Sequence, residues 1–225
     1  MYFSPETMLF LKELRDNNNR EWFQANKQRY EECVRTPALN LIEDTGPLLR
    51  QISPNFTAIP KKVGGSLMRI YRDARFSRDK TPYKLNIGIQ FRHAMGRDVH
   101  APGYYLHIQP GLCFIGAGIW RPDSKALGKI RERIDRQPEC WLAVRDDREF
   151  NAHYKLIGES LKNPPRGYTR EHPLLKDLKR KDLIADHELE DTEIFFRDLP
   201  DQIAGTFARS TSFMAFLCDA LEIPF

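Results

Sequence analysis

Apolar side chains alternate with small or polar ones in Leu85-Asn86-Ile87-Gly88-Ile89-Gln90-Phe91-Arg92. A period of two is typical of a β-strand with one buried face. The same alternation is found in residues 104–109, and residues 112–119 continue it after the turn pair Pro110-Gly111. With residues 66–72 placed before them, these segments predict four strands in an antiparallel meander.

Helical signals flank the predicted strands on both sides. Ser4 suits an N-cap and Pro5 the first helical position, where its missing N–H costs nothing. Asn18 is the predicted cap of a second helix, because Glu21 follows it by three residues as in a capping box. Gly46-Pro47 is expected to kink or split the third helix. Further helix starts are predicted at Pro37, Pro122, Pro138 and Pro200.

The composition is that of a globular protein. Hydrophobic residues make up 41% of the 225 residues and charged residues 29%, which is enough apolar material for a core. We find no internal repeat and no long linker. The expected architecture is one α+β domain over residues 1–225. It consists of a small antiparallel sheet of about four strands, packed by helices from the N-terminal and C-terminal parts of the chain.

Charge, cysteine spacing and hydropathy limit the classes of partner. The formal net charge of +4 is mild, whereas nucleic-acid-binding domains usually carry a stronger excess. The four cysteines show no C-x-x-C spacing, which favours reduced, mostly buried thiols in a cytoplasmic protein. We find no signal peptide and no apolar run of the roughly 20 residues that a membrane span needs, so no membrane partner is expected.

The most basic stretch is Arg69-Ile70-Tyr71-Arg72-Asp73-Ala74-Arg75-Phe76-Ser77-Arg78-Asp79-Lys80-Thr81-Pro82-Tyr83-Lys84. It holds six basic and two acidic side chains, an excess of four that equals the charge of the whole chain. Arginine forks and lysine ammonium groups bind carboxylates and phosphates. We therefore expect a pocket for a small phosphorylated or carboxylated ligand. The candidate contacts are Arg69, Arg72, Arg75, Ser77, Lys80 and Lys84, together with Tyr105 and His107 on a predicted strand.

Chemistry on that ligand would need a base and an acid. Asp73 is the candidate general base and Tyr83 the candidate acid or nucleophile. No nucleotide-binding, hydrolase or zinc-protease motif supports a reaction, so enzymatic activity stays an open question. The histidines at positions 93, 100 and 107 do not have a recognised ligand spacing, so neither a metal nor a cofactor is expected.

Two other interpretations use the same residues. Asp73 or Asp79 is the expected partner of Arg72. The pairs Arg72–Asp73 and Asp79–Lys80 could form a structural ion-pair network that fixes the loop and supports a protein-interaction role. Alternatively, the arginines could neutralise nucleic-acid phosphates, with the basic run Lys179-Arg180-Lys181 extending the track. A pocket would favour the small ligand, and a flat stripe would favour nucleic acid. The oligomeric state is not determined by any of these features.

The order of these motifs resembles a widespread bacterial and fungal family of conserved hypothetical proteins, a domain of unknown function. The resemblance rests on residues 18–27, 69–84, 103–108, 116–120, 165–168 and 178–182. It spans nearly the whole chain and therefore implies a single domain. It implies no activity, cofactor or catalytic residue.

Overall fold

The centre of the fold is one antiparallel sheet of six strands. The computed structural model describes residues 1–96 and 101–225, and its strand order is β1-β2-β3-β4-β6-β5. The strands are β1 (Phe56–Thr57), β2 (Ile87–His93), β3 (Gly103–Ile108), β4 (Cys113–Ile119), β5 (Lys155–Ile157) and β6 (Leu183–Leu189). The sheet is open, with β1 and β5 at its edges.

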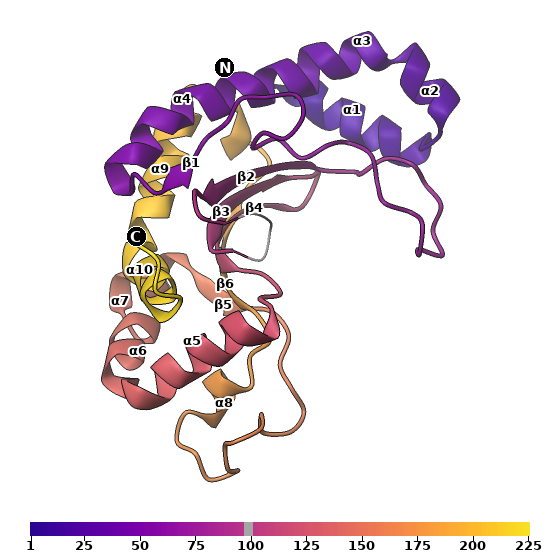
Figure 1. Ribbon diagram of the computed structural model, residues 1–225. Coiled ribbons are helices and arrows are strands. Elements are labelled where there is room, and N and C mark those ends of the chain that lie inside the picture. Colours follow the sequence, from indigo (N-terminus) through magenta and orange to yellow (C-terminus); the bar gives the residue numbers. More distant parts are fainter. Residues whose placement is uncertain (97–100) are drawn as a thin grey trace.

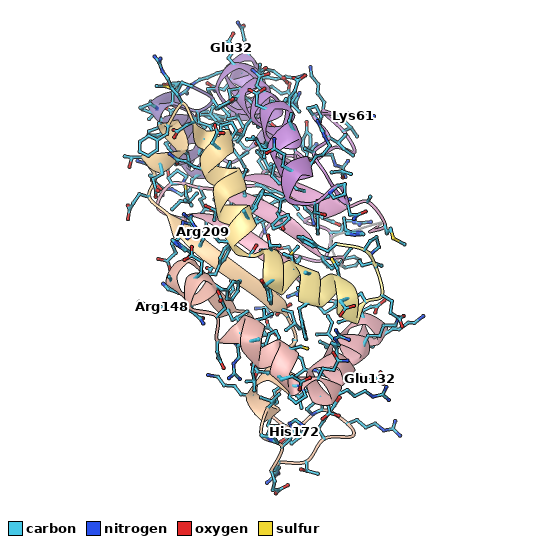
Figure 2. The ribbon with its side chains drawn as sticks, turned by 90° about the vertical axis from the view of Figure 1, so that its left-hand side faces the viewer. Glu32, Lys61, Glu132, Arg148, His172 and Arg209 are labelled. Atoms are coloured by element: carbon cyan, nitrogen blue, oxygen red, sulfur yellow. The ribbon has the colours of Figure 1, made fainter. Side chains whose placement is uncertain are left out.

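Helices precede, interrupt and follow the strands in the sequence. They are α1 (Pro5–Asp16), α2 (Arg20–Ala25), α3 (Lys27–Tyr30), the π-helical turn η1 (Glu31–Arg35), α4 (Thr36–Ile52), α5 (Ser124–Arg136), α6 (Pro138–Arg145), α7 (Arg148–His153), α8 (Leu175–Leu178), the 3-10 turn η2 (Glu193–Phe195), α9 (Leu199–Arg209) and α10 (Thr211–Ala220). Helices α4, α9 and α10 lie on one side of the sheet (Figure 1). Figure 2 looks onto this side, where α9, ending at the labelled Arg209, and α10 cross the strands.

The alternation along β3 shows how the sheet divides the molecule. Tyr104, Leu106 and Ile108 are fully buried, and the ring of Tyr104 stacks on Phe207 of α9 with 4.3 Å between ring centroids. Tyr105, which follows Tyr104, faces the opposite side, because successive side chains of a strand alternate. One face of the sheet therefore packs against the helices, and the other is left for the candidate site.

The α+β prediction is confirmed, but the sheet has more strands than predicted. Strands β2, β3 and β4 match three predicted strands. Residues 66–72 form only isolated pairings, because the chain leaves the edge of β2 after the hydrogen bond from the Met68 N–H to the Gly88 carbonyl at 2.9 Å. Strand β6 was not predicted, since the polar run Asp186-His187-Glu188 hides its alternation.

Most predicted helix starts are confirmed to within one or two residues, including Pro5 in α1 and Pro138 in α6. The cap of α2 is Asn19 rather than Asn18: its side chain accepts the Trp22 N–H at 2.9 Å. Helix α4 continues through Pro47 without a break, held by its packing on α9.

The predicted last helix is two helices separated at Ser210. Its buried hydroxyl donates to the Phe207 carbonyl at 2.8 Å, and this bond accompanies the turn of the chain from α9 into α10. The cysteines match the sequence-based expectation in part. All four are free thiols, and Cys33, Cys113 and Cys218 are buried while Cys140 is half-buried.

Candidate functional site

The basic stretch forms a hairpin, called here the arm (residues 69–84), that projects from the sheet (Figure 1). Its two sides are joined where the Arg72 N–H donates to the Pro82 carbonyl at 2.8 Å and the Lys84 N–H donates to the Ile70 carbonyl at 2.7 Å. Between these bonds, Tyr71 pairs with Tyr83. The hairpin brings residues ten to fourteen positions apart into contact, and this decides which charges meet.

Half of the charged side chains of the arm pair with one another. Arg72 binds Asp79 and also donates to the Thr81 hydroxyl at 2.6 Å, while Arg75 binds Asp73 through two bonds of 2.7 and 2.9 Å. Of the two expected partners of Arg72, Asp79 is confirmed and Asp73 is not, and the suggested pair Asp79–Lys80 does not form. The hairpin places Asp79 opposite Arg72, and Asp73 turns to the side chain two residues on.

The two candidate catalytic residues of the arm lie in settings that do not favour the predicted roles. The hydrogen bond from the Arg75 side chain, followed by that from its backbone, lowers the pKa of Asp73 to about 2, which makes this carboxylate a weak base. Tyr83 is 1% exposed and stacks on Phe23 of α2 at 4.1 Å. Asn18 binds the main chain of Tyr83 on both sides, accepting its N–H at 3.1 Å and donating to its carbonyl at 3.0 Å.

A cleft lies over the face of the sheet opposite α9 and α10. It has a volume of about 490 Å³ and is lined by residues of the arm and of β2 to β6. Its floor is hollow because glycines occupy neighbouring positions: Gly103 of β3 pairs with Gly118 of β4, and Gly116 lies beside Tyr105. Apolar walls are contributed by Met68, Phe114, Trp120, Ile157 and Ile184. A concave, mostly apolar cleft with a few polar groups is the usual form of a small-molecule site.

Three polar side chains meet in this cleft, one from the residue before β2 and two from β3. The hydroxyl of Tyr105 and Nδ1 of His107 are 3.1 Å apart, and the amide nitrogen of Asn86 lies 3.4 Å from each. His107 also stacks on Phe114 at 4.7 Å. Burial lowers the pKa of His107, so its imidazole is neutral near pH 7 and Nδ1 can accept the Tyr105 proton.

The hydroxyl of Tyr105 keeps its own proton under these conditions. Burial raises the pKa of Tyr105 to about 12. The trio can therefore position a polar ligand group and pass a proton, with the phenol as donor and the imidazole as acceptor.

Lys84 supplies positive charge at the edge of the cleft. Burial, and then the charge of Arg69, lower the pKa of Lys84. In residues 1–96 and 101–225, neither Lys84 nor Arg69 has an ion-pair partner. Two neighbouring cations without a carboxylate would both be stabilised by an anion.

Asp186 lies across the cleft floor from Tyr105. Gly116 pairs with both residues, so the two side chains are separated by a strand that carries no side chain at that point. One carboxyl oxygen of Asp186, Oδ1, is buried without a hydrogen-bond partner, and burial followed by the charge of Glu188 raises its pKa. The charges of Lys155 and His187 act to lower the pKa of Asp186, but they do not outweigh burial and Glu188.

The raised pKa of Asp186 predicts how stability depends on pH. The penalty for its charge is absent below the pKa that it has in the unfolded chain and complete above its folded pKa. We expect Asp186→Asn to raise the melting temperature by a few degrees at pH 7 and to leave it unchanged near pH 3. Glu190→Gln, which removes an equal charge from an exposed position, is the control. A gain of equal size at both pH values would contradict the assignment.

The structure separates the sequence-predicted site residues into three groups. Lys84, Tyr105 and His107 meet in the cleft. Arg72, Lys80 and Tyr83 border a second hollow between α2 and the arm. The remaining candidates, Arg69, Asp73, Arg75 and Ser77, line neither of the two.

Sequence reasoning missed the cleft residues Asn86, Gln90, Trp120 and Asp186. Asn86 and Gln90 belong to the non-apolar face of a predicted strand, and that face was a usable signal. No such signal marked Asp186, because β6, the strand that carries it, was not predicted from the sequence.

Neither a metal cluster nor a membrane helix is found in the described ranges. They contain no group of three or more His, Cys, Asp or Glu side chains able to hold a metal ion, and His100 lies outside them. His93, on β2, contacts the Pro224 carbonyl through Nε2 at 2.7 Å. The helices in these ranges are too short or too polar to cross a membrane.

Comparison with known proteins identifies the family. The model of a family of conserved hypothetical proteins, DUF2461, matches residues 6–216. The chain belongs to this family. The match includes the arm and every strand that lines the cleft, so both are parts of the DUF2461 domain. Neither a curated protein nor a solved structure was found to match the chain.

Proposed function

We propose that this DUF2461 protein binds a small molecule with an apolar or planar body and one carboxylate or phosphate group in the cleft. The observation that carries the proposal is the position of Lys84, an ammonium group partly desolvated at the edge of a 490 Å³ hollow and close to the charge of Arg69. An anionic group beside Lys84 would offset both the removal of its ammonium from water and its repulsion from Arg69. The proposal moves the expected ligand from the centre of the arm to its base.

The other groups of the cleft suit the rest of such a ligand. Phe114 and Trp120 offer flat apolar surface, and the glycine floor leaves room for a ring to lie against the sheet. Tyr105 and Asn86 can donate and accept hydrogen bonds at one point, which fixes orientation. Proton transfer to or from the bound molecule would fall to Tyr105 with His107, or to Asp186 opposite them.

The contacts of the second basic run support the choice of a small ligand over nucleic acid. Lys181 pairs with Glu159 at 2.9 Å, and Arg180 donates to the Ile157 carbonyl at 3.2 Å. Helix α8, which precedes this run, lies near the bottom of Figure 1, well below the arm, which projects to the right. Separated and partly paired cations favour a compact ligand over a polymer.

Two substitutions in the cleft test the proposal. The wild type is first screened by thermal shift against carboxylic acids and phosphate esters, because a ligand of the folded state raises the melting temperature. Lys84→Met keeps the aliphatic stem and removes the charge. Gly116→Leu fills the floor, where the nearest atom to an added Cβ is 3.6 Å away. Lys84→Met is expected to weaken binding by about tenfold or more, since one charge-assisted hydrogen bond contributes roughly 1.5–3 kcal/mol. Gly116→Leu is expected to weaken binding as well, because its side chain would occupy the space of the ligand.

Lys12→Met is the matched control, because it removes a lysine charge from an exposed position of α1 outside the cleft. It should bind the ligand as the wild type does. A ligand whose affinity is unchanged in both cleft variants would show that the anionic molecule binds elsewhere.

A further inference from the structure

A second hollow, called here the arm pocket, lies between α2 and the arm. Its volume is about 410 Å³, and it shares no lining residue with the cleft. Helix α2 contributes Arg20 and Gln24, which are four residues apart and so lie on one face of the helix. The arm contributes Tyr71, Arg72 and Lys80. Sequence elements about fifty residues apart thus present polar groups to one space.

The charge of the arm pocket is positive. Arg20, Arg72 and Lys80 line it, and none of the described residues that line it is acidic. Arg72 is neutralised by Asp79, but the Lys80 ammonium bonds only the neutral carbonyls of Ala74 and Arg75, at 3.0 and 3.4 Å. Arg20 has no ion pair within the described ranges. Among the described residues, no carboxylate therefore compensates two of the positive charges at this space.

The donors of the arm are held in place before any ligand arrives. The guanidinium of Arg72 is fixed by Asp79 and by the hydroxyls of Thr81 and Ser77, at 2.6 and 3.5 Å. Asp79 in turn accepts the Thr81 N–H at 2.9 Å, and this backbone bond, with Arg72, lowers its pKa to about 2. Donors fixed in this way lose little conformational entropy when they bind an oxyanion.

An aromatic surface borders the same space. The ring of Tyr71 is 53% exposed and lies 5.5 Å from the buried ring of Tyr83. An exposed tyrosine beside fixed cations can pack against a ring or chain attached to the anionic group. The arm pocket can therefore contact the organic part of a ligand as well as its anionic group.

We infer that the arm pocket is a second ligand site, which binds the phosphate group of a phosphorylated small molecule through Arg20, Lys80 and Arg72. This goes beyond the function proposed for the cleft, since the two hollows have no residue in common. Tyr83 borders the arm pocket and Lys84, the next residue, lines the cleft, so each site lies on one side of the same strand of the arm.

Calorimetric titration with inorganic phosphate and phenyl phosphate, at constant ionic strength in sodium chloride, tests the inference. Arg20→Gln and Lys80→Gln are each expected to weaken phosphate binding by about tenfold, and the pair together by more. Tyr71→Ala should weaken phenyl phosphate more than inorganic phosphate. Circular dichroism melts of each variant establish that the protein is folded.

Two control variants separate this site from the cleft. Arg78→Gln removes an equal charge from an exposed position of the arm, and Lys84→Met alters only the cleft, so both should bind inorganic phosphate as the wild type does. Lys84→Met is also the background in which phenyl phosphate is titrated, because the ring and phosphate of this probe match the ligand proposed for the cleft. Equal weakening by Arg78→Gln would reduce the effect to net charge and overturn the inference. Loss of phosphate binding in Lys84→Met alone would assign the phosphate to the cleft, and no binding at millimolar phosphate would leave the arm as a structural ion-pair network.

Discussion

Gly118→Ala should destabilise the protein more than any other glycine-to-alanine change in the cleft. Gly118 has φ +125°, a backbone conformation that costs other residues about 1–3 kcal/mol. A Cβ there would lie 2.1 Å from the Leu183 carbonyl oxygen and 2.9 Å from the Ile184 Cα. Both are backbone atoms of β6, so neither can move aside without breaking the β4–β6 pairing. We expect a loss of about 3 kcal/mol or more, which for this chain length lowers the melting temperature by roughly 6–12 °C.

Gly116→Ala is the matched control, two residues earlier on the same strand and on the same face. Its added Cβ would meet only ordinary contacts, the nearest at 3.6 Å to Tyr105. We expect its stability to change by less than about 1 kcal/mol. Urea unfolding of both variants gives the comparison. Similar midpoints for the two variants would mean that β4 and β6 can separate locally at Gly118, contrary to the close approach described here.

The sequence predicted the faces of the strands better than their number. Alternation identified β2, β3 and β4 because their apolar positions are large residues, such as Ile89 and Phe91. It failed for β6, where Ala185 and His187 occupy inward positions and are weak hydrophobic signals. The cleft was predictable in part, since its floor is the small and polar face of the predicted strands. The far wall of the cleft could not be predicted, because it belongs to β6, which was not recognised in the sequence.

The arm shows why the charges were harder to assign than the strands. Neighbours in the sequence suggested Arg72–Asp73 and Asp79–Lys80, with Asp79 as the other candidate partner of Arg72. The hairpin pairs Arg72 with Asp79 and Arg75 with Asp73. A charge pattern contains no information on register until the turn is known. For the same reason, the sequence did not predict that Lys84 would line the cleft while its neighbour Tyr83 lines the arm pocket.

Tyr83→Ala should cause a second large loss of stability, because the structure gives this side chain a packing role. The ring is 1% exposed, stacks on Phe23 at 4.1 Å and lies beside Tyr71 at 5.5 Å. Removing a buried aromatic ring costs about 3–5 kcal/mol, through lost burial and the cavity that remains. The two hydrogen bonds between the Asn18 side chain and Tyr83 involve only the main chain of Tyr83 and should persist, so the arm would remain attached to the N-terminal helices.

Tyr83→Phe separates this packing role from the catalytic role that the sequence suggested. Phenylalanine keeps the stacked ring and removes only the hydroxyl, whose pKa is raised, chiefly by burial. We expect Tyr83→Phe to unfold in urea within about 1 kcal/mol of the wild type. It should also bind the cleft ligand with unchanged affinity, because Tyr83 does not line the cleft. A phenylalanine variant that folds normally but loses turnover of a ligand found in the screen would return Tyr83 to the list of catalytic residues. A Tyr83→Ala variant as stable as the wild type would contradict the packing role.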